Sequence, residues 1–156
     1  MRREGSIDRP GINHMVNALH RATWNTYTGK RCLKVKYINN TGAPSVRGEG
    51  VKFDPAVDNA VVLNGALEDQ CIGAFAEDDV DDGAIAEIIV DGSVQFMLKN
   101  LTASVRGWVG CSDVGGRFDA SSAAPIPARH WEEAGHSSEV NAGGTDILIE
   151  GVAHFN

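Results

Sequence analysis

The stretch that decides the fold is EIIVDGSVQF, residues 87–96, which aligns without gaps to DILIEGVAHF, residues 146–155. In both stretches an acidic residue, three aliphatic residues, a second acidic residue, a glycine and a final phenylalanine follow in the same order. Aliphatic runs bounded by turn-forming residues are typical of short strands. Each stretch therefore predicts a β-unit that bends at Gly92 or Gly151 and buries its aliphatic side chains. Two related units, or two independent units with similar turns, both explain the similarity.

Further strands are expected on both sides of residues 87–96. The run CLKVKYI, residues 32–38, is rich in strand-forming residues and stops at the dense turn signal NNTGAP, residues 39–44. Other short candidates, separated by Gly, Asp and Pro, are 50–53, 60–63, 70–76, 84–90, 93–98, 108–111 and 147–155. This pattern predicts a mainly β fold, a small barrel or sandwich of seven or eight short strands, with a β-core over about 32–156.

The N-terminal part of the chain has a different pattern. Residues 1–11 mix arginines and acidic residues with two glycines and a proline, without periodicity, so we expect a flexible N-terminal arm. The apolar residues that follow recur at helical spacing, namely Ile12, Met15, Val16 and Leu19. They predict one amphipathic helix over about 12–23, which opens a single β-rich domain, 12–156.

Composition limits the classes of partner. The chain has 156 residues and a formal net charge of −7, with a sequence pI near 5.1. This charge disfavours binding to the phosphate backbone, so no nucleic-acid partner is expected. No apolar run approaches the length of a membrane span, and no signal peptide is recognisable, so we expect no membrane association and synthesis in a cytoplasm.

No motif predicts a catalytic, cofactor-binding or metal-binding site. The acidic run 77–83 lacks the spacing of an EF-hand loop, so we interpret it as a solvated turn. The five histidines lack the spacing of a helical zinc pair, and no glycine-rich phosphate loop or nucleophile elbow is present. The three cysteines are an odd number at wide spacing and are expected to be reduced, structural thiols: Cys32, Cys71 and Cys111.

The order of the segments resembles a known family. KYINNTG at residues 36–42 and VRGEGV at 46–51 are followed by CIGAFAED at 71–78, and then by WVGCSDVGGRF at 108–118. The closing strand ILI, residues 147–149, completes the series. These blocks resemble the decoration (cement) proteins of tailed-phage capsids over roughly residues 34–156. The sequence ARHWEE at 128–133 departs from the family, which usually has an isoleucine-glycine pair late in the chain.

The resemblance implies a non-enzymatic bacteriophage structural protein. Such a viral protein binds the outer surface of the mature icosahedral head as a trimer, and it stabilises the capsid by bridging major capsid protein subunits. Its expected location is the virion, at the capsid outer surface, with the host cytoplasm during assembly. We assign capsid binding to the arm, because a segment without its own core can become ordered against a partner, and its candidate residues are Arg2, Arg3, Ile7 and Arg9.

Two alternatives from other classes remain open. A small metal-dependent β-barrel enzyme could use some combination of His130, His136 and His154. A carbohydrate-binding β-module could stack a sugar on Trp108 or Trp131.

Overall fold

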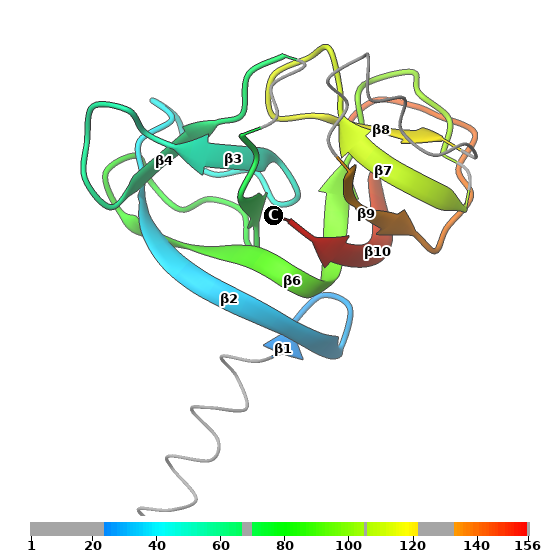
Figure 1. The fold of residues 1–156 in the computed structure, drawn as a ribbon, viewed down its shortest axis with the longest axis horizontal. Coiled ribbons are helices and arrows are strands. Elements are labelled where there is room, and N and C mark those ends of the chain that lie inside the picture. The colour runs from blue at the N-terminus through cyan, green and yellow to red at the C-terminus, as the bar shows by residue number, and fades with distance from the viewer. Residues whose placement is uncertain (1–23, 67–69, 105, 122–132, 156) are drawn as a thin grey trace, which may run out of the picture.

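The computed structural model describes residues 24–66, 70–104, 106–121 and 133–155. These residues form ten strands, which Figure 1 shows along the chain. The strands are β1 (Trp24–Asn25), β2 (Lys30–Asn39), β3 (Gly50–Phe53), β4 (Ala60–Leu63), β5 (Gly73–Phe75), β6 (Ile85–Met97), β7 (Gly107–Cys111), β8 (Phe118–Ser121), β9 (Glu133–Ser137) and β10 (Leu148–His154). None of the described ranges contains a helix, and so none contains one able to span a membrane.

The chain is mainly β, as expected, but the predicted fold class was wrong. Instead of seven or eight strands and one N-terminal helix, the described residues form ten strands in one mixed sheet. The two candidates at 84–90 and 93–98 are one continuous strand, β6, while β1, β8 and β9 were missed. The corrected fold class, as the described residues show it, is all-β and has no N-terminal helix. The stretch 12–23, where that helix was expected, and the arm, 1–11, lie outside the described residues.

The sheet is organised around β6, which has 13 residues. Its first half pairs antiparallel with β2, and its second half pairs antiparallel with β10. The pairings β2–β4, β4–β3, β3–β5, β5–β6 and β6–β2 make a closed circuit, in which only β2–β4 is parallel. The sheet continues from β6 through β10, β9 and β7 to β8. Figure 1 accordingly shows β3 and β4 at one end of the domain and β7 to β10 at the other.

Gly92 lies where β6 passes from one set of partners to the other. Its φ of +82° is in the left-handed region, and a Cβ there would lie 2.8 Å from the carbonyl oxygen of Arg31. The register between β2 and β6 also shifts beside it, between Leu33 and Lys34. Glycine is therefore required at the predicted bend, both by the backbone conformation and by the close approach of β2.

The two similar sequence stretches pair with each other. Ile149 faces Phe96 and Gly151 faces Val94 across the β10–β6 pairing. Unlike Gly92, Gly151 does not have a positive φ. A Cβ on Gly151 would instead lie 2.2 Å from the carbonyl oxygen of His136, so glycine is needed there because β9 approaches closely.

The core consists of two clusters. The larger lies between β6 and the strands β7 to β10, with Phe96, Phe118 and Ile149 fully buried. The smaller lies among β2 to β6 and includes Phe75 and Ile88. The predicted burial of aliphatic side chains in both similar stretches is confirmed for Ile88, Ile89 and Ile149.

Candidate functional site

The arm residues Arg2, Arg3, Ile7 and Arg9, predicted to bind the capsid, lie outside the described residues. The first described strand, β1, lies at one edge of the sheet and pairs with the first residues of β2. The buried side chain of Asn25 connects this strand to β6, because it donates a hydrogen bond to the carbonyl oxygen of Ser93 at 3.1 Å. The same side chain accepts a hydrogen bond from the amide of Tyr27 at 2.9 Å. The N-terminal segment is thus joined to a firmly held edge of the sheet.

The acidic run 77–83 connects β5 to β6 and is hydrogen-bonded to the loop that contains residues 42–47. Asp78 accepts a hydrogen bond from the amide of Arg47 at 2.7 Å, and Asp82 accepts one from the amide of Gly42 at 2.8 Å. The interpretation as a turn is confirmed. These carboxylates hold one loop to another.

The three cysteines are buried, and none forms a disulfide bond. Burial raises the pKa of the Cys32 thiol above its ordinary value, although Lys34 acts in the opposite direction. A buried thiol with a raised pKa is a poor nucleophile, because the thiolate is the reactive form.

A partly buried ion-pair cluster joins the turn before β8 to two other segments of the chain. The guanidinium of Arg117, in the turn before β8, lies 3.4 Å from Oε1 of Glu49 and 2.8 Å from Oδ1 of Asp146. Burial raises the pKa of Glu49 above its ordinary value, and the charge of Arg117 partly offsets that rise. Burial likewise raises the pKa of Asp119. We interpret this cluster as structural, because its charged groups connect segments of the fold to one another.

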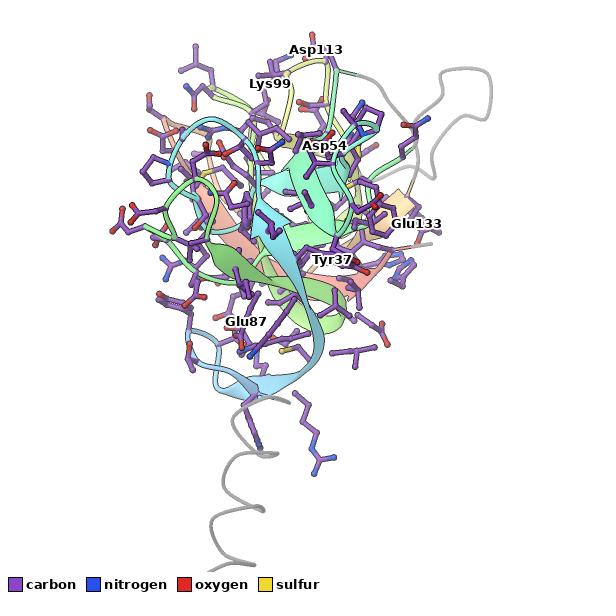
Figure 2. The ribbon with its side chains drawn as sticks, turned by 90° about the vertical axis from the view of Figure 1, so that its left-hand side faces the viewer. Tyr37, Asp54, Glu87, Lys99, Asp113 and Glu133 are labelled. Carbon is purple, nitrogen blue, oxygen red and sulfur yellow. The ribbon has the colours of Figure 1, made fainter. Side chains whose placement is uncertain are left out.

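One exposed face of the sheet carries side chains that lie close to one another. We call it the β9–β10 face, and its residues are Trp108, Glu133, His136, Val152 and His154. His136 lies directly opposite Val152 on β10 and opposite Trp108 on β7. The ring centroids of Trp108 and His136 are 4.4 Å apart, and the rings of His136 and His154 stack at 5.4 Å. Figure 2 labels Glu133 on one flank of the domain, away from Glu87 and from the Lys99–Asp113 ion pair.

A β-bulge places Glu133 on this face. Val109 pairs with Gly135 and Gly110 pairs with Glu133, so the register shifts by one residue on β9. In a regular strand, residues 133 and 136 would point to opposite faces, because side chains alternate. The bulge removes that alternation. Oε1 of Glu133 consequently contacts Nε2 of His154 and lies 3.6 Å from Nδ1 of His136.

The sequence predicted some of the residues of the β9–β10 face. Of the three histidines considered together, the structure brings His136 and His154 side by side, while His130 lies outside the described residues. Trp108 borders the same face, and Trp131 also lies outside the described residues. The sequence did not predict Glu133 as a site residue, because its place beside the histidines depends on the bulge and on the β9–β10 pairing.

Comparison with known proteins yields a likeness of fold. No protein-family model and no curated protein sequence matches the chain. The crystal structure of the head fiber gp8.5 N base in bacteriophage phi29 superposes with a TM-score of 0.50 at 13% sequence identity. The superposition covers 78% of this chain and 92% of that one. The chain therefore has the fold of a domain found in a bacteriophage head fiber.

Proposed function

We propose that the chain is a non-enzymatic structural protein of a tailed-phage head, and more narrowly a decoration protein that binds the outer surface of the mature head. The observation that carries this proposal is the likeness of fold to the phi29 head fiber N base, which extends over nearly all of that domain. The order of sequence blocks that resembles phage decoration proteins supports the same role independently.

The fold suits a bridging role. Its strands join in one hydrogen-bonded sheet, and a hydrogen bond from Asn25 connects β1 to Ser93 of β6. A rigid domain loses little conformational entropy on binding, and such pre-organisation favours affinity.

We assign the main contact to the arm, where Arg2, Arg3 and Arg9 would pair with acidic groups of the major capsid protein and Ile7 would be buried. Ordering a flexible segment costs about 1–2 kcal/mol per residue, so the arm would need extensive contacts with the shell. A protein that binds only the mature lattice stabilises that lattice by mass action. We further propose that three copies associate at each binding position.

Co-sedimentation with mature heads that lack the chain tests this proposal. The full-length protein should sediment with the heads, and a variant lacking residues 1–9 should bind much more weakly. Replacing Arg2, Arg3 and Arg9 with glutamine should also weaken binding and reduce its salt dependence. Arg31→Gln with Lys36→Gln is the matched control, since both side chains are exposed on β2 and carry the same type of charge. A full-length protein that remained in the supernatant would refute the proposed function.

A further inference from the structure

The β9–β10 face contains three side chains whose donor atoms could hold a metal ion. The carboxylate of Glu133 and the ring nitrogens of His136 and His154 all lie within 4.8 Å of one another. Across the described ranges, this is the one group of three or more potential metal ligands. Both imidazoles are about half exposed, so an ion can reach them from solvent.

The backbone holds these side chains close together. His136 and His154 project from neighbouring antiparallel strands in diagonal positions, because His136 pairs with Val152 and His154 lies two residues farther along. Gly135 and Gly151 let the strands approach: a Cβ on Gly135 would lie 2.1 Å from the carbonyl oxygen of Val152. Sites carried by packed strands keep their ligands in place better than sites on loops.

Two neighbouring side chains affect this group of potential ligands. Trp108 packs against His136 on one side, which limits the orientations available to that imidazole. On the other side, Asp91 of β6 is the cross-strand partner of His154 and adds a second exposed carboxylate to the neighbourhood. The carboxylates of Glu133 and Asp91 would therefore both attract a cation to this face.

The donor set indicates the class of ion. Two imidazole nitrogens and one carboxylate oxygen suit Zn²⁺ and its neighbours Ni²⁺ and Cu²⁺, whereas Mg²⁺ and Ca²⁺ prefer oxygen ligands throughout. Three ligands leave at least one coordination position open to water.

We propose that Glu133, His136 and His154 bind one divalent late first-row metal ion, Zn²⁺, Ni²⁺ or Cu²⁺, at the surface of the domain. The site does not depend on the proposed role in the phage head. It also requires no catalytic activity, because the three ligands need only hold the ion.

Calorimetric titration of tag-free, full-length protein with Zn²⁺ tests the proposal. The wild type should bind Zn²⁺ at a saturable site. Each of the variants His136→Ala, His154→Ala and Glu133→Gln should weaken this binding by at least about tenfold. Loss of a residue that only hydrogen-bonds to a metal ligand already weakens metal binding by about this factor. Glu77→Gln is the matched control for the loss of a carboxylate and should leave the affinity unchanged. Titration with Mg²⁺ should give no comparable binding.

A second readout locates the ion. Cu²⁺ quenches nearby indole fluorescence, and the ring of Trp108 is 4.4 Å from that of His136. Saturable quenching should be present in the wild type, lost in His154→Ala and reduced in Trp108→Phe.

Melting curves without metal should be nearly the same for the wild type and the ligand variants, because the replaced imidazoles are about half exposed. Added Zn²⁺ should raise the melting temperature of the wild type alone. If a variant fails to fold, His136→Gln and His154→Gln take its place. A wild type without saturable Zn²⁺ binding, or folded ligand variants with undiminished affinity, would overturn the proposal.

Discussion

Replacing Arg117 with methionine should destabilise the protein at neutral pH by about 3 kcal/mol, at the low end of the range for breaking a buried ion pair. The side chains of Arg117 and Glu49 are 18% and 12% exposed, so this pair is shielded from water on most sides. Methionine retains the apolar length of the side chain but leaves the Glu49 carboxylate without its counter-charge. The partner Asp146 is largely exposed, and the loss of its pairing should contribute little.

The pH dependence gives the sign of the effect. The pKa of Glu49 is raised in the folded protein by burial, so the native state binds this proton more tightly than the unfolded chain does. Ionised Glu49 therefore destabilises the fold, and protonation relieves that cost as the pH falls through the folded pKa. Without Arg117 the pKa rises further. The stability lost in Arg117→Met should thus be largest near neutral pH and should shrink as the pH falls towards the ordinary value of 4.5.

Urea denaturation measured at about pH 7 and about pH 5 provides the assay. Adding Glu49→Gln to Arg117→Met should restore at least about 1 kcal/mol at the higher pH, because it removes the unpaired charge. Lys30→Met is the control: it breaks an exposed ion pair with Glu150 and should cost less than about 1 kcal/mol. A pH-independent loss in Arg117→Met, or a double variant no more stable than the single one, would refute the reasoning.

Three further predictions concern the strand contacts, the thiols and the arm. Gly151→Ala should lower the free energy of unfolding by about 2 kcal/mol or more, because the new Cβ would collide with the backbone of β9. The control Gly115→Ala should lower it by less, and equal urea midpoints of the two variants would contradict this prediction. A thiol reagent such as DTNB should modify no cysteine in the native protein and all three in denaturant, and rapid native labelling would show that their burial is wrong. Deleting residues 1–9 should leave the melting temperature nearly unchanged, and a large decrease would show that the arm belongs to the folded core.

The strands predicted correctly are those whose residues carry a local signal. The region of β2 is rich in β-branched and aromatic residues and stops at a dense turn, and β4 is an aliphatic run. In contrast, β8 and β9 have the sequences FDAS and EAGHS, which lack β-branched residues. They are strands because β7 lies between them and pairs with both. Such tertiary pairing overrides local propensity.

The candidate metal site was predictable only in part, for a related reason. Histidine content placed His136 and His154 in one hypothesis, but their contact depends on the pairing of β9 with β10. The third ligand, Glu133, reaches the same face only through the bulge opposite Val109 and Gly110. Neither the long-range pairing nor the bulge leaves a periodic signal that a single sequence reveals.

The proposed role is tested most directly by electron cryomicroscopy of mature heads assembled with and without the chain. The account predicts additional density on the outer surface, at the boundaries between major capsid protein subunits, into which the ten-stranded domain fits with β1 directed towards the shell. Heads with identical maps in both preparations, or additional density confined to the inner surface or the tail, would contradict it.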